Sequence, residues 1–167
     1  MSQAEPLLIE YYSACVKRGT KLKESLDKCY PLFPLNETTL LDLTTEQEEA
    51  FDALILRYSQ LTAMVQDHLF RLIAIVEQED VSQKSNRDKA LLMEKLGVIH
   101  SADDFSIAVQ LRNKFSHHYP DQVTRQVERL NMVLHESKTI LSYLKMISNY
   151  LQRKGFINQV WESGHER

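Results

Sequence analysis

The residues best suited to chemistry lie in one short stretch, Arg112 to Tyr119, which reads Arg-Asn-Lys-Phe-Ser-His-His-Tyr and is followed by Pro120. A guanidinium can stabilise negative charge that develops on a phosphate, and an imidazole can take up a proton near neutral pH. On a continuous helix Arg112 and His117 would point roughly 140° apart, too far to act on one atom. Pro120 disfavours helical geometry for the residue before it, so we expect the helix to unwind around His117 or His118 and bring the two side chains together.

The composition is that of one soluble globular domain, since 43% of the 167 residues are hydrophobic and 26% are charged. With only 4 Gly and 4 Pro, long helices are favoured over the many turns of a β fold. The net charge of -3 argues against a protein that coats nucleic acid, although a local basic site is compatible with it. We find neither a signal peptide nor a membrane span. Cys15 and Cys29 lack metal-binding spacing, which indicates reduced thiols in a cytoplasmic protein.

Apolar residues that recur every three or four positions predict a set of helices, and breakers and caps give their ends. The expected helices cover about residues 6–29, 45–79, 87–96, 101–117 and 121–155, with Thr45, Ser101 and Asp121 as N-terminal caps and Gly97 and Gly155 as C-terminal stops. Between the first two, Leu32 and Phe33 are expected to fill a hydrophobic gap, and residues 157–167 are expected to be loose. The fold class is therefore all-α, a helical bundle.

The spacing of the reactive residues resembles that of a known family. The chain resembles the signature of the HEPN superfamily, in particular of HepT-like toxins, in the order Arg112-Asn113, three residues, His117, one residue and Tyr119. The preceding Leu96-Gly97-Val98-Ile99 resembles the lead-in to that signature. The resemblance implies a single HEPN-type domain over 1–167, with a core of about five helices over about 45–155 and an added N-terminal helix within 1–36.

The resemblance also implies a function. HepT-like proteins are metal-independent endoribonucleases that act as the toxin of a toxin–antitoxin pair, and they form homodimers in which two motif helices face one cleft. Their antitoxin is a minimal nucleotidyltransferase that adds AMP to the motif tyrosine, which is Tyr119 here. The expected partners are thus RNA, a second copy of the chain and the nucleotidyltransferase, with no cofactor, no metal and no membrane. Pro120 directly after the tyrosine departs from the pattern.

The residue types suit this chemistry on their own account. His117 is the candidate base for the 2′-hydroxyl proton, Arg112 the candidate cation for the transition state, and Asn113 would orient the histidine or contact the sugar. A positive surface for the RNA backbone would be formed by Lys114, His118, Arg125 and Arg129. It is equally open that the lysine and the two arginines of this set only form a solvated helix face.

Other interpretations of single residues and of the whole chain remain open. Asp67 is a candidate partner for Arg112, but an exposed acid is favoured at that position. His68 falls on an apolar stripe, where a hydrogen-bonded core histidine is the expectation, and a metal site built from His117, His118 and His135 is disfavoured. The chain could instead be a non-catalytic helical subunit that binds substrate for a nucleotidyltransferase, or an interaction-only bundle.

Overall fold

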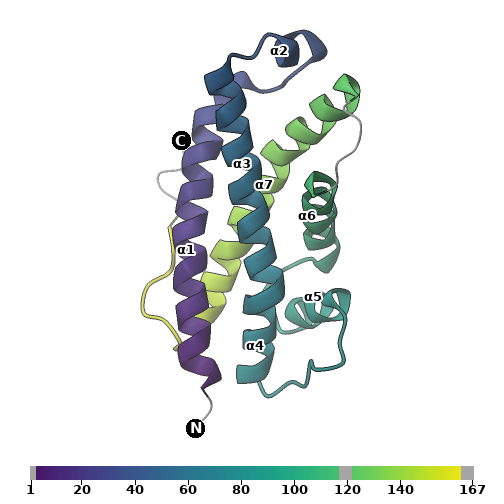
Figure 1. The fold of residues 1–167 in the computed structure, drawn as a ribbon. Helices are drawn as coiled ribbons and strands as arrows, with labels where there is room; N and C mark the ends of the chain where they lie inside the picture. Colours follow the sequence, from purple (N-terminus) through teal and green to yellow (C-terminus); the bar gives the residue numbers. More distant parts are fainter. Residues whose placement is uncertain (1–2, 117–121, 163–167) are drawn as a thin grey trace.

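The computed structural model describes residues 3–116 and 122–162, and these residues form the all-α bundle that the sequence predicts (Figure 1). The elements in order are α1 (Ala4–Cys29), the 3-10 turn η1 (Tyr30–Leu32), α2 (Glu37–Leu41), α3 (Thr45–Met64), the π-helical turn η2 (Val65–Leu69), α4 (Phe70–Val76), α5 (Asn86–Lys95), α6 (Ala102–Phe115) and α7 (Val123–Arg153). In Figure 1, α1 and α3 run side by side, α7 crosses behind them, and α5 and α6 cover one flank.

The N-terminal helix α1 is built on one apolar stripe that faces the core. Leu8, Cys15 and Leu22 are fully buried at spacings of seven residues, which is two helical turns. The stripe packs along α3 and α7, so the helix that we expected as an addition contributes to the same core as the other helices. After Pro31 the chain turns, and Phe33 packs edge-on against Phe51 of α3 at 5.4 Å between ring centroids, in line with the expected hydrophobic plug.

The long helix predicted over 45–79 is present, but its cap and its end differ from the prediction. Thr44, and not Thr45, is the N-cap: its hydroxyl accepts the N–H of Gln47 at 3.2 Å, and the Gln47 side chain accepts the N–H of Thr44 at 2.9 Å. Thr44 with Gln47 and Thr45 with Glu48 both satisfy the capping-box pattern, so the sequence alone does not separate them. The helix runs through α3, η2 and α4 and ends at Val76.

The π-helical turn η2 changes which side chains of this helix are buried. A π turn inserts one extra residue, so the buried face falls one position later after it. Leu69 and Ile73 are fully buried, whereas Ile75, which the regular spacing assigns to the core, is 37% exposed. His68 is only half-buried for the same reason.

Three of the predicted helix ends in the second half of the chain are confirmed. Ser101 caps α6, and Gly97 and Gly155 take positive φ angles of 78° and 79° just past α5 and α7; Ser85, for which no cap was predicted, caps α5. For α7 the N-cap is Gln122, without a side-chain cap bond, so the expectation of Asp121 as cap is wrong by one position. Asp121 itself lies outside the described residues.

The tail after α7 is docked as far as Glu162, contrary to the expectation of a loose segment. Trp161 is 7% exposed, and its N–H donates to the Ser148 hydroxyl of α7 at 2.7 Å. The same hydroxyl is hydrogen-bonded to Tyr12 of α1 at 2.8 Å. Gly19 of α1 lets both α7 and the tail come close: a Cβ there would lie 2.6 Å from Leu144 of α7 and 3.3 Å from the Trp161 indole.

The packing of Phe156, Ile157 and Trp161 against the core and the ion pair between Lys145 and Glu162 hold this segment in place. Along the helices that the structure describes, none is long and apolar enough to cross a membrane.

Candidate functional site around Arg112

Helix α6 carries the first part of the predicted site. Phe105, Ala108 and Leu111 form its buried face, each no more than 1% exposed. Arg112 follows at the edge of this face and is half-buried, while Asn113 and Lys114 point to solvent. The α6 helix therefore holds the guanidinium at the boundary between core and solvent, beside the negative end of the helix dipole, where a cation is favoured.

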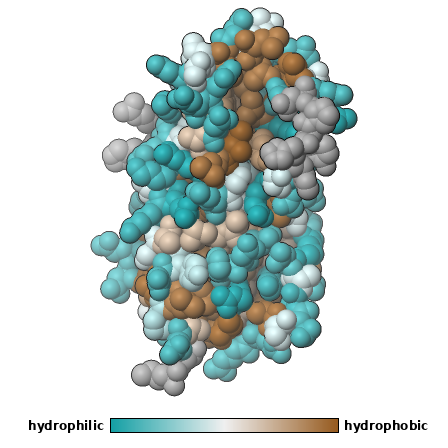
Figure 2. All heavy atoms as spheres, viewed as in Figure 1, coloured by the Kyte–Doolittle hydropathy of each residue, from teal (hydrophilic) through white to brown (hydrophobic). Residues whose placement is uncertain are grey.

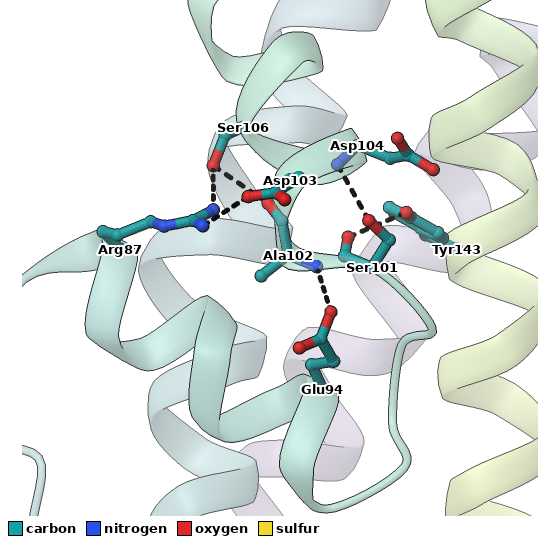
Figure 3. Close-up of polar contacts among 8 residues, drawn as sticks. All are labelled: Arg87, Glu94, Ser101, Ala102, Asp103, Asp104, Ser106 and Tyr143. Carbon is teal, nitrogen blue, oxygen red and sulfur yellow. Dashed lines mark hydrogen bonds and ion pairs between the residues drawn. The ribbon is translucent and has the colours of Figure 1, made fainter.

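The N-terminal end of α6 is tied to α5 by polar contacts (Figure 3). Arg87 of α5 donates to the Ser106 hydroxyl at 2.9 Å and forms an ion pair with the Asp103 carboxylate. Glu94, at the other end of α5, accepts the N–H of Ala102 at 3.0 Å. These bonds fix the start of α6 relative to α5.

A second set of bonds ties the same end of α6 to α7, as Figure 3 also shows. The Tyr143 hydroxyl of α7 donates to the Ser101 carbonyl at 2.9 Å, and the Ser101 hydroxyl accepts the N–H of Asp104 at 3.1 Å. Tyr143 is 1% exposed, and burial raises the pKa of its phenol to about 12. The phenol thus stays protonated and can act as a donor throughout the physiological range.

The C-terminal half of α6 is held by one tyrosine of α3. Tyr58 is fully buried, and its hydroxyl donates to the Ala108 carbonyl at 2.5 Å. Burial raises the pKa of Tyr58, the Glu136 carboxylate raises it further, and the Arg112 guanidinium lowers it. Both charged groups therefore act on the same phenol, where α3, α6 and α7 meet.

Glu136 is a carboxylate in a position that suits an apolar residue. It is 5% exposed on α7, between the fully buried Val133 and Ile140. Burial raises the pKa of Glu136, the exposed His135 lowers it, and Asp104 of α6 raises it. The His135 ring nitrogen Nε2 lies 3.9 Å from the carboxylate, which makes a weak pairing for a buried charge.

The predicted site residues are only in part within the described structure. Arg112, Asn113 and Lys114 lie on the last turn of α6, which ends at Phe115, earlier than the expected end at His117 or His118. Arg125 is exposed and Arg129 half-buried, both near the start of α7. His117, His118 and Tyr119 lie outside the described residues, so the meeting of His117 with Arg112 stays a prediction.

Asp67 does not hold Arg112. It is exposed on η2, accepts a hydrogen bond from the Gln66 amide at 3.3 Å, and forms no ion pair with Arg112. The favoured interpretation, an exposed acid, is the correct one at this position.

The expectation of a hydrogen-bonded core histidine at His68 is wrong. Its ring stacks on Tyr11 of α1 with centroids 4.3 Å apart, and its buried Nδ1 has no hydrogen-bond partner within 3–116 and 122–162. The π turn places the ring against an aromatic neighbour, where no polar group meets its nitrogen.

Cys15 and Cys29 are buried free thiols, as expected, and burial raises the pKa of Cys15 to about 12. No group of three or more His, Cys, Asp or Glu in the described part of the chain is arranged to hold a metal ion.

Two cavities lie away from Arg112. One, of about 360 Å³, is bordered by α1 and α3 and includes Lys28 and Arg57; the other, of about 340 Å³, includes His100 and Arg153.

The sequence interpretation missed the roles of Tyr58, on whose phenol Arg112 acts, and of Glu136, which acts on the same phenol. Tyr58 falls on the apolar stripe of its helix, and nothing in the spacing separates a tyrosine with a structural hydroxyl from an ordinary core aromatic. The burial of Glu136, in contrast, could have been predicted from the sequence. It lies three residues after Val133 and four before Ile140, so the helical period places a carboxylate on the buried face of α7.

Comparison of the chain with protein-family models, with curated proteins and with solved structures finds no match in any of the three.

The buried carboxylate predicts a pH dependence of stability. Because burial raises the pKa of Glu136 above its ordinary value, the folded chain holds more protons than the unfolded chain between the two values. Protonated Glu136 therefore contributes to the stability of the fold at low pH, and this contribution is lost as the pH rises through the pKa that Glu136 has in the folded chain. We expect Glu136→Gln, which keeps the shape and removes the charge, to raise the free energy of unfolding at neutral pH by about 1 kcal/mol.

The gain should shrink as the pH falls towards 4.5, the ordinary pKa of a glutamate. Urea denaturation at a series of pH values measures it, with Glu128→Gln on the exposed face of α7 as the control. A Glu136→Gln chain that is no more stable than the wild type at neutral pH contradicts the prediction.

Proposed function

We propose that this chain is a metal-independent endoribonuclease and acts as the toxin of a toxin–antitoxin pair. The observation that supports it is the state of Arg112. Its guanidinium is half-buried at the end of α6, yet it forms no hydrogen bond or ion pair with the residues that the structure describes. A half-buried cation without an anion among the described residues is available to an external one, and a phosphate is the anion that a guanidinium fits best.

In the proposed reaction His117 removes the proton of the 2′-hydroxyl, whose oxygen attacks the adjacent phosphorus. The bond to the 5′-oxygen breaks as an acid gives that oxygen a proton, leaving a 2′,3′-cyclic phosphate and a 5′-hydroxyl. Arg112 stabilises the negative charge on the phosphate oxygens in the transition state, and Asn113 orients the histidine or the sugar. Lys114, His118, Arg125 and Arg129 would hold the backbone of the RNA.

The first test is cleavage itself. We expect the purified chain to cleave RNA in the presence of EDTA, and Arg112→Ala and His117→Ala each to lower kcat/KM by at least about a hundredfold, the usual share of a base or of a charge-stabilising group. The matched controls are Arg153→Ala and His100→Ala, exposed residues of the same types away from the end of α6, which should remain active.

Two outcomes contradict this mechanism. One is loss of cleavage on chelation, and the other is full activity of Arg112→Ala. A chain that never cleaves RNA but forms a stable complex with a nucleotidyltransferase favours the alternative, a non-catalytic subunit that binds substrate.

We also propose that the active form is a homodimer. One copy offers one imidazole at position 117, whereas the reaction needs both a base and an acid, and a two-fold axis would bring a second copy of the same group. Exposed apolar side chains support this proposal: Leu41 of α2 is 71% exposed, Leu56 of α3 58% and Ile107 of α6 45%. Figure 2 shows apolar atoms gathered over the upper half of this face, around α2 and the upper parts of α3 and α7.

Sedimentation velocity at micromolar concentration should therefore give the mass of two chains. Activity per chain should fall when the protein is diluted until it dissociates. A monomer that cleaves RNA at the same rate per chain refutes the shared site.

The regulation that we propose is transfer of AMP to Tyr119 by a partner nucleotidyltransferase. A nucleotide two residues from His117 would place a bulky anion where the RNA phosphate binds, so charge and volume both favour inhibition. Intact mass after co-expression with the nucleotidyltransferase should rise by one or more AMP groups, and Tyr119→Phe should abolish the increase. Tyr30→Phe, at a tyrosine that is 55% exposed on another element, is the control and should gain the same mass as the wild type. An equal gain in Tyr119→Phe shows that Tyr119 is not the site.

A further inference from the structure

The Ala108 carbonyl of α6 is an acceptor for two donors. In the regular helix it accepts the N–H of the residue four positions later, which is Arg112. It also accepts the hydroxyl of Tyr58, which approaches from α3. The Ala108 carbonyl oxygen thus accepts both the hydrogen bond from the Tyr58 hydroxyl and the helical hydrogen bond from the Arg112 N–H.

Tyr58 otherwise serves to fill the core, and burying its hydroxyl costs desolvation free energy. The side chain is fully buried, so its hydroxyl has given up its water and depends on the Ala108 carbonyl for its hydrogen bond. A phenylalanine would pack in the same space without that cost. The hydroxyl is therefore best explained by what it fixes, namely the helical turn between Ala108 and Arg112.

The charges around Tyr58 agree with this role. Arg112 and Glu136 both act on the phenol, with opposite effects. The phenol donates its one proton to Ala108, so its oxygen keeps lone pairs for the Thr62 hydroxyl and for the positive charge of the guanidinium, both of which lower the pKa of Tyr58. Tyr58 therefore bonds the Ala108 carbonyl, the same oxygen that accepts the Arg112 N–H in the helix, and its phenol oxygen attracts the guanidinium electrostatically.

We propose that Tyr58 is a positioning residue for Arg112: its hydroxyl fixes the turn of α6 from which the guanidinium projects, and so sets how well the transition state is stabilised. The inference rests on the proposed ribonuclease function. A cation that acts on developing charge must be held within a fraction of an ångström, whereas binding of the RNA backbone by several cations tolerates more movement. Loss of the hydroxyl is therefore expected to lower kcat and leave KM nearly unchanged.

The chain offers a matched control for this role. Tyr143 is also buried, and its phenol also donates to a backbone carbonyl at α6, but that carbonyl belongs to Ser101 at the opposite end of the helix. Tyr58→Phe and Tyr143→Phe each remove one buried hydrogen bond of the same kind. A merely structural effect is expected to be similar in the two variants.

The kinetic test compares cleavage by both variants under conditions where both are folded, as judged by circular dichroism. We expect kcat to fall about tenfold in Tyr58→Phe, with KM within about twofold of the wild type, and to be unchanged in Tyr143→Phe. In an Arg112→Ala background Tyr58→Phe should have no further effect, because it acts through the arginine. Equal kcat values for the two phenylalanine variants, or a full tenfold effect without Arg112, overturn the proposal.

A second measurement does not depend on activity. Hydrogen exchange at the Arg112 amide, measured relative to that of Leu61 in the core of α3, should be faster in Tyr58→Phe than in Tyr143→Phe. If the wild type does not cleave RNA, the proposed function is wrong, and this measurement alone decides the structural part of the inference. Equal exchange in the two variants shows that Tyr58 does not hold this turn, whatever the activity.

Discussion

Apolar burial of the helix from Thr45 to Val76 is the interaction on which the other elements depend. Its α3 part packs against α1, α6 and α7, and its α4 part packs against α1 and α5. Leu54, Leu61 and Val65 are fully buried along its length. Because this helix is covered on several sides, the positions of α6 and α7, and with them the position of Arg112, are set by contacts with one central element.

The polar groups inside this apolar framework are concentrated where α6 meets its neighbours. One end of α6 is fixed by Tyr143, Glu94 and Arg87, and its other half by Tyr58. Buried polar groups specify geometry more sharply than apolar contacts, because a hydrogen bond tolerates little displacement. A helix held in this way at both ends presents Arg112 in a defined direction, which is what a preorganised site requires.

The sequence predicts those features whose physical cause is local. Gly97, Ser101 and Gly155 mark helix ends because a positive φ or a capping hydroxyl acts within a few residues. It does not predict the π turn at η2, since the buried face of that helix moves by one residue only in response to α1 and its other neighbours. For the same reason the surroundings of His68 were predicted incorrectly. The docking of Trp161 was missed because the indole packs beside Gly19 of α1, which lies far earlier in the sequence.

The contact between α1 and α7 has a consequence for how the chain is made. Tyr12 and Ser148 are 136 positions apart, and Trp161 joins them from still later in the sequence. A ribosome therefore releases α1 and α3 well before the helix that covers them exists. During that interval the stripe of Leu8, Cys15 and Leu22 has only α3 and α4 to pack against, so part of it stays open to water. Such a nascent chain presents apolar surface of the kind that chaperones bind, and it loses that surface when α7 closes over α1.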